Sequence, residues 1–210
     1  SSSKETFDNI ISKGYGAGIA YNETTNKTYT IKFNGNGNTG GSTASMSMTY
    51  GVAKNLTANG FTKTGNSFVK WNTKANGSGT SYTNKQSVKN LTSTQGATVN
   101  LYAQWDPYDL KVYYNANGGA INSSTYYLSS KNVYKESDST RYYQTWTYNS
   151  TKADGLVNAS TFGLYRTGYR FTKWGTSTTG GTLFDQNDAT VKPTDLNSNI
   201  KTGDCTRTLY

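Results

Sequence analysis

Apolar and polar residues alternate in several short stretches of the chain, and this period of two predicts β-strands rather than helices. In the first stretch Tyr29, Ile31 and Phe33 fall on one face, while the residues between them are polar. One segment, 52–59, lacks the alternation and predicts one or two helical turns. Further strands are expected at 46–50, 68–71 and 99–105, with a Gly/Asn-rich loop at 72–80.

Three sequence motifs occur twice, in the same order. YTIKFNGNG at 29–37 returns as LKVYYNANG at 110–118, and GNSFVKW at 65–71 returns as GYRFTKW at 168–174. TVNLY at 98–102 returns as TRTLY at 206–210. Because all three pairs occur in the same order, we interpret the chain as a duplicated structural unit, in which each copy is a small module.

The duplication predicts three segments. Residues 1–28 match neither copy and are either the end of a preceding module or a packed lead-in; 29–106 form the first module and 107–210 the second. Pro107 is expected to break the last strand of the first module and to begin a very short linker near 106–108.

The second module is longer than the first. Phe33 and Tyr114 are 81 positions apart, whereas Trp71 and Trp174 are 103 apart, so the second copy carries about 22 extra residues. We expect this insertion near 120–165, in a stretch rich in tyrosine.

Composition favours thin β cores built from aromatic side chains. Only 33% of the residues are hydrophobic, whereas tyrosine alone numbers 18, and one such ring buries ~150–250 Å². Residues that recur at equivalent points of both copies are expected in these cores. The predicted core residues are Phe33, Phe68, Trp71, Leu101, Trp105, Tyr114, Phe171 and Trp174.

The absence of histidine and the single cysteine exclude several kinds of catalytic and metal site. Ser/His/Asp and Cys/His nucleophile arrangements are impossible, and one thiol, Cys205, cannot build an all-thiolate zinc site. We therefore predict no catalytic residues, no cofactor and no metal site, and expect that the protein is not an enzyme.

Two motifs indicate a possible binding function only weakly. The segment 35–40 matches GxGxxG, but a strand rather than a helix is expected after it, so a glycine-rich turn is favoured over phosphate binding. Acidic residues gather at Asp185, Asp188 and Asp195; a solvated turn is favoured there, and calcium binding stays an open alternative.

The net charge is +9, carried by scattered Lys and Arg residues without a long basic run. This charge favours acidic or hydroxyl-rich polymers as partners without specifying one, and a merely solvated cationic surface is the simpler interpretation. No 18-residue apolar segment or signal-peptide pattern occurs, so we expect no membrane insertion.

The tyrosines of the insertion are the candidates for ligand binding. Exposed tyrosines offer rigid contact surface at low entropic cost, and loops on a rigid scaffold commonly carry binding sites. The alternative is that the insertion only extends the sheet. The candidate ligand-binding residues are Tyr126, Tyr127, Tyr134, Tyr142 and Tyr143.

The ordered motifs resemble the Listeria–Bacteroides repeat, also known as the internalin B-type B repeat. The resemblance rests on Phe33–Gly37, Gly65–Trp71 and Thr98–Trp105, and again on Tyr114–Gly119, Gly168–Trp174 and Thr206–Tyr210. Two features depart from the pattern: Arg207 stands where the first copy has Val99, and the tyrosine-rich insertion is atypical.

The resemblance implies a mainly β or α+β fold with two tandem β-grasp-like modules in an elongated arrangement. It also implies a non-catalytic stalk, spacer or adhesive segment of a bacterial surface or secreted protein, located outside the cell or in the cell wall and covalently continuous with further domains. The alternative function is a dedicated glycan- or cell-wall-polymer-binding module that uses the tyrosine-rich insertion. Expected partners are an acidic or hydroxyl-rich polymer or a host surface protein, without specific nucleic-acid binding.

Overall fold

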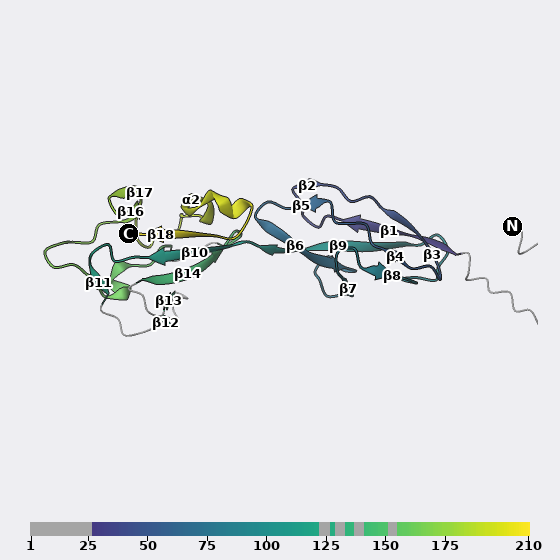
Figure 1. Cartoon of the computed structure of the whole chain (residues 1–210), viewed down its shortest axis with the longest axis horizontal. Coiled ribbons are helices and arrows are strands. Elements are labelled where there is room, and N and C mark those ends of the chain that lie inside the picture. Colours follow the sequence, from purple (N-terminus) through teal and green to yellow (C-terminus); the bar gives the residue numbers. More distant parts are fainter. Residues whose placement is uncertain (1–26, 122–126, 129–132, 137–140, 151–154) are drawn as a thin grey trace, which may run out of the picture. The chain divides into compact units, whose positions relative to one another are not determined.

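The computed structural model describes residues 27–121, 127–128, 133–136, 141–150 and 155–210 (Figure 1). In this part of the chain the fold is mainly β, with one short α-helix and two short 3-10 helices. Of the sequence-predicted residues, Tyr126 lies outside the described residues, as does the segment 1–26.

Contacts between Cα atoms divide the chain into two compact units. The described residues of the first unit are 27–36, 42–60 and 70–103. The second unit comprises the described residues of 104–210 together with Gly37–Gly41 and Phe61–Val69. Two segments that precede residue 104 in sequence are therefore part of the second unit.

The larger sheet of the first half of the sequence has the strand order β3-β1-β9-β6-β7. Strand β1 pairs antiparallel with β3 and parallel with β9, while β6 pairs antiparallel with β7. Two small two-stranded sheets, β2-β5 and β4-β8, accompany it. The bounds are β1 (Thr28–Asn34), β2 (Gly40–Gly41), β3 (Met46–Thr49), β4 (Lys54–Asn55), β5 (Phe61–Thr62), β6 (Asn66–Asn72), β7 (Ser81–Tyr82), β8 (Ser87–Val88) and β9 (Thr98–Pro107).

Burial along β1 follows the predicted alternation. Tyr29, Ile31 and Phe33 are buried, whereas Thr28 and Lys32 are exposed. One face of the sheet thus forms the core, because successive side chains of a strand point to opposite faces. The other buried apolar residues of this unit are Met48, Leu56, Trp71, Val88, Leu101 and Ala103.

The larger sheet of the second unit has the strand order β12-β13-β14-β10-β18. Strand β10 pairs antiparallel with β14 and parallel with β18 (Figure 1). Its strands are β10 (Asp109–Tyr114), β12 (Tyr127–Leu128), β13 (Val133–Lys135), β14 (Tyr142–Thr147) and β18 (Cys205–Leu209). The remaining elements are β11 (Ala120–Ile121), η2 (Ala159–Phe162), β15 (Leu164–Tyr165), β16 (Trp174–Ser177), β17 (Gly180–Phe184), α2 (Pro193–Leu196) and η3 (Ser198–Lys201).

The two sheets share a three-strand plan. In each, the opening strand of the repeated motif is flanked by one antiparallel and one parallel neighbour: β3-β1-β9 in the first and β14-β10-β18 in the second. The turns after β1 and β10 also match, because Asn36 and Gly37 have positive φ, as do Asn117 and Gly118. Asparagine and glycine tolerate this left-handed conformation best.

The expected insertion contributes to the sheet and to the core. Strands β12 and β13 lie outside β14 in the sheet order, where the described residues of the first unit form no strand beyond β3. Val133 of β13 and Tyr142 and Trp146 of β14 are fully buried. The described part of 120–165 therefore builds structure and is not only a surface loop.

Two sequence-based expectations are corrected. The segment 52–59 contains the short strand β4 and no helix, because its residues 54 and 55 pair with β8. Pro107 does not break the last strand of the first copy: β9 continues through Pro107, and only Tyr108 separates it from β10. A proline at the last position of a strand is tolerated, since its missing N–H need not serve the ladder.

Among the described residues, no helix is both long and apolar enough to cross a membrane.

Candidate functional site

A buried polar network lies in the core of the second unit. The Tyr114 hydroxyl donates to Gln144 Oε1 at 2.5 Å, and Trp146 Nε1 donates to the same oxygen at 2.8 Å. The Val157 N–H in turn donates to the Tyr114 hydroxyl at 3.2 Å. Burial raises the pKa of Tyr114 well above its ordinary value, so this hydroxyl stays protonated and keeps donating. The network is structural, because its side chains are fully or almost fully buried.

Three tyrosines form a row across the opposite face of this sheet, hereafter the tyrosine row: Tyr113 of β10, Tyr143 of β14 and Tyr134 of β13. Tyr113 is in register with Tyr143, and Tyr143 with Tyr134. The Tyr134 and Tyr143 rings stack with centroids 5.6 Å apart, and the Tyr113 and Tyr143 rings are 6.0 Å apart. Tyr134 is 42% exposed, and the other two are half-buried.

Two cations cover part of the tyrosine row. Lys111 Nζ lies 4.0 Å from the Tyr143 ring centroid, and the Arg141 guanidinium lies 4.0 Å from that of Tyr113. Arg141 also forms an ion pair with Glu136 at 2.6 Å. Cation–π contacts of this kind are attractive and help to hold the rings in place, while Glu136 offsets the charge of Arg141.

The structure separates the five tyrosines predicted to bind ligand. Tyr134 and Tyr143 belong to the tyrosine row. Tyr142 points to the opposite face and is fully buried, so it offers no surface to a ligand. Tyr127 lies on β12 in register with Tyr134, and Tyr126 is outside the described residues. Sequence reasoning did not single out Tyr113 or Lys111, although their position on the repeated strand β10 places both on its solvent face.

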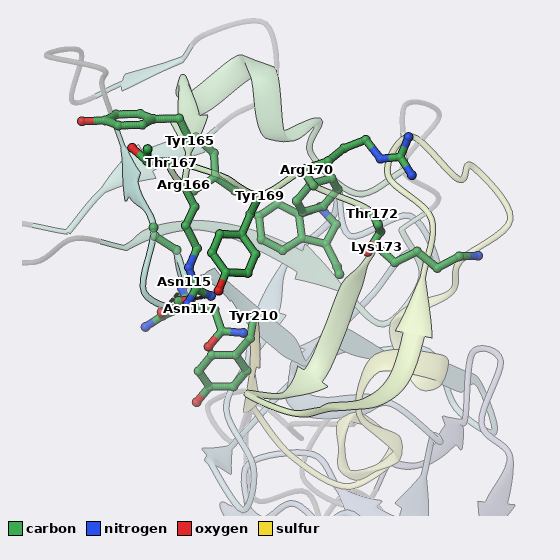
Figure 2. Close-up of a pocket in the computed structure, with 15 residues that line it drawn as sticks. Asn115, Asn117, Tyr165, Arg166, Thr167, Tyr169, Arg170, Thr172, Lys173 and Tyr210 are labelled. Atoms are coloured by element: carbon green, nitrogen blue, oxygen red, sulfur yellow. Dashed lines mark hydrogen bonds between the residues drawn. The ribbon is translucent and has the colours of Figure 1, made fainter.

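A second surface, hereafter the arginine cleft, lies beside the β15–β16 connection of the second unit. Its volume is about 510 Å³, and Asn117, Arg166, Tyr169, Arg170 and Tyr210 are among the residues that line it. Figure 2 shows Arg166, Tyr169, Asn117 and Tyr210 gathered on one side, whereas Arg170 and Lys173 point away. None of the described residues that line the cleft is acidic.

A tight turn positions Arg166 and Tyr169. The Tyr169 N–H donates to the Arg166 carbonyl at 3.0 Å, and Gly168 has φ +80°, the conformation that a type II turn requires at its third residue. The turn places the Arg166 guanidinium 4.0 Å from the Tyr169 ring centroid. Tyr165 and Tyr169 remain 56% and 68% exposed, which is unusual for such large rings.

The floor of the cleft is the structural core of the second unit. Trp174 is almost fully buried and donates from Nε1 to the Val157 carbonyl at 2.8 Å. The Phe171 and Tyr114 rings pack at 5.0 and 4.9 Å from the Trp174 ring. Lys173 at the rim pairs with Asp185 at 2.8 Å, so its charge is locally offset.

The predicted core residues differ in their degree of burial. Phe33, Trp71, Leu101, Tyr114 and Trp174 are buried. The other three, Phe68, Trp105 and Phe171, are half-buried. Phe68 and Trp105 pack edge to face with ring centroids 5.8 Å apart.

The acidic residues of the 185–195 segment serve local structure. Asp188 accepts from both the backbone and the hydroxyl of Thr190, and these hydrogen bonds lower its pKa. Asp195 accepts from the Lys192 N–H at the start of α2. Within the described residues no group of three His, Cys, Asp or Glu side chains is placed to hold a metal ion.

The lone cysteine is poorly suited to nucleophilic chemistry. Cys205 is partly buried on β18, and its pKa is raised, first by burial and then by the neighbouring Asp204 carboxylate. Since the thiolate is the reactive form, a raised pKa lowers reactivity at neutral pH.

Comparison with known proteins gives one family match. Residues 29–104 match the Listeria-Bacteroides repeat domain, a repeat domain of bacterial surface proteins. The matched segment is similar to that family from the start of β1 almost to the end of β9. Comparisons with curated proteins and with solved structures give no match.

Proposed function

We propose that this chain is a pair of tandem, non-catalytic repeat modules of a bacterial surface or secreted protein, and that it acts as a spacer or adhesive segment. The observation that carries the proposal is the shared three-strand plan, β3-β1-β9 and β14-β10-β18, of which the first instance lies in the segment that matches the Listeria-Bacteroides repeat. The second copy is then a repeat of the internalin B type enlarged by β12 and β13.

The strand order supports a β-grasp-like description of the first module. Its four principal strands lie in the order β3-β1-β9-β6, with the first and last strands of the motif, β1 and β9, parallel at the centre. Strands β1 and β9 each have a hydrogen-bonded neighbour on both edges, β3 and β6 being the outer partners. Such a module suits a load-bearing spacer.

The tyrosine row supports the adhesive alternative. Its rings lie in register on three adjacent strands, and Lys111 places positive charge directly beside them, whereas Glu136 offsets the charge of Arg141. Aromatic faces stack on sugar rings, and cations attract acidic substituents. We therefore propose an acidic or hydroxyl-rich polymer as the ligand of an adhesive segment, located at the cell surface.

A polysaccharide and glycan array with the purified chain tests the two roles. A spacer gives no selective signal, whereas an adhesive segment gives a signal that Tyr134→Ala and Tyr143→Ala reduce together. Tyr82→Ala, on the short strand β7 of the first unit, is the matched control and leaves the signal unchanged. Selective binding that survives both tyrosine-row substitutions contradicts the assignment of this surface.

A further inference from the structure

The turn at the start of the repeated motif, GNSFVKW at 65–71 and GYRFTKW at 168–174, has the same backbone conformation in both copies. In the first copy the turn is buried, whereas in the second it is exposed. In the first copy the Asn66 N–H donates to the Lys63 carbonyl at 3.0 Å; in the second copy Tyr169 donates to Arg166 at 3.0 Å. Gly65 and Gly168 occupy the same position of the turn, with φ +73° and +80°. The two turns therefore form an internal comparison.

The first turn is covered by other parts of the second unit, to which residues 61–69 belong. The Gly65 N–H donates to the Lys201 carbonyl, and the Gly65 carbonyl accepts from the Tyr108 N–H, both at 2.8 Å. A Cβ on Gly65 would lie only 2.1 Å from Tyr148 ring atoms. Gly65 and Asn66 are buried as a result.

The second turn has no such cover in the described structure. Apart from its chain neighbours, no heavy atom of the described residues lies within 4 Å of the Cβ position of Gly168. Tyr169 is 68% exposed where Asn66 is 7% exposed, and Tyr165 beside it is 56% exposed. Large exposed rings around a bare turn are typical of an interaction surface.

The groups that cover the first turn have counterparts at one end of the first unit. Tyr148 directly follows Thr147, which pairs with Asp109 across the sheet. The Tyr148 N–H donates to the Tyr108 carbonyl at 3.0 Å. In the same way, Tyr50 directly follows Thr49, which pairs with Thr28. The Tyr50 N–H donates to the Lys27 carbonyl at 2.7 Å. Among the described residues, Gly51 beside it has no heavy atom within 4 Å of its Cβ position, and Val52 is 50% exposed.

From this we infer that the Arg166–Tyr169 turn of one chain docks on the Tyr50 end of a second copy of the same chain, as the Lys63–Asn66 turn docks on Tyr148. The contact joins two different surfaces, so it is head-to-tail and open to further addition. The occupant of the arginine cleft is thus another copy of the protein. The inference goes beyond the spacer function, which holds equally for a monomer.

Two substitutions on opposite surfaces test the contact in the whole chain. Gly168→Ala leaves the isolated turn uncrowded but introduces a Cβ that would collide with a docked tyrosine ring, as at Gly65. Tyr50→Ala removes that ring from the other surface. Tyr134→Ala, on the tyrosine row, is the matched control. Sedimentation velocity over a range of concentrations measures association, and thermal unfolding establishes that each variant is folded.

The expected result is concentration-dependent association of the parent chain and of Tyr134→Ala into species larger than dimers. Each of the other two variants alone stays monomeric, whereas their equimolar mixture forms dimers and nothing longer, since only one intact pair of surfaces remains. Should Tyr50→Ala melt early, Val52→Asp replaces it at the same end of the first unit.

Three results would overturn the inference: a parent chain that is monomeric at every concentration, association that Gly168→Ala leaves unchanged, or a mixture that stays monomeric. Titration with heparin provides a separate arm. Saturable heparin binding that Arg166→Ala abolishes, in a monomeric parent chain, would assign the cleft to acidic polysaccharide instead. A negative outcome here leaves the array test of the spacer and adhesive roles unaffected.

Discussion

At the scale of single residues, Gly65 and Gly168 share one backbone conformation, but a substitution is expected to cost more stability at Gly65 than at Gly168. Both have positive φ, so an alanine at either position costs about 1–2 kcal/mol of backbone strain. Only at Gly65 does the new Cβ also meet the Tyr148 ring. Overpacking of this kind typically adds ~1–3 kcal/mol.

We therefore predict that Gly65→Ala lowers the free energy of unfolding distinctly more than Gly168→Ala. Urea unfolding of the two variants under dilute, monomeric conditions measures the difference. Equal losses would show that Tyr148 moves aside without cost and that the cover of the first turn is loose.

Tyr114 gives a second residue-scale prediction, on alkaline stability. Burial raises its pKa in the folded chain above the ordinary value of 10.0, so above that pH the unfolded chain loses a proton that the folded chain keeps. The unfolded state then binds fewer protons, and stability falls as pH rises beyond ~10. Below that pH the group contributes no pH dependence.

We expect Tyr114→Phe to remove this part of the alkaline loss, at a cost near neutral pH. The Val157 N–H loses its acceptor and Gln144 loses one donor, and an unpaired buried polar group costs about 1–3 kcal/mol. Denaturant unfolding at neutral and alkaline pH checks both effects. If the variant loses stability with rising alkaline pH as steeply as the parent chain, groups other than Tyr114 dominate the alkaline loss of stability.

At the scale of elements, the strands β12 and β13 have no counterpart in the described part of the first unit. The shared plan β14-β10-β18 needs neither strand. We predict that replacing residues 122–140 by a short Gly/Ser connection leaves the second unit folded but less stable. The loss includes burial of Val133, and a valine side chain contributes ~1.5–3 kcal/mol when fully buried.

Circular dichroism and thermal unfolding of the shortened chain test this prediction. Loss of cooperative unfolding in the shortened chain would show that β12 and β13 are integral to the second unit.

At the scale of the whole molecule, the first module has a complete core of its own. All of its buried apolar residues lie between Tyr29 and Ala103. We therefore predict that a fragment of residues 27–107 unfolds in one cooperative transition. Its Gly65 turn loses the hydrogen bonds to Tyr108 and Lys201, so its amides exchange with deuterium faster than in the full chain.

Differential scanning calorimetry and hydrogen exchange on the fragment measure these two properties. A fragment without a cooperative transition would argue that the second unit, which includes residues 61–69, is needed to fold the first.

The sequence by itself determined the parts of the fold that depend on local chemistry. Period-two alternation placed the inward face of β1, and Asn-Gly pairs placed its turn, because side-chain direction in a strand and tolerance of positive φ are properties of single residues and their neighbours. The repeated motifs likewise indicated that Trp71 and Trp174 are equivalent, and both are buried.

Only the tertiary structure decided which strands become neighbours and what covers each surface. Gln144 lies on the inward face of β14, where alternation alone predicts an apolar residue. This buried polar side chain is accommodated because Tyr114 and Trp146 both donate hydrogen bonds to its oxygen. Tyr142 and Tyr143 look alike in sequence, yet pairing with β10 buries one and leaves the other in the tyrosine row. The two identical glycine turns differ for the same reason: burial is set by contacts between residues distant in sequence, and no local pattern encodes them.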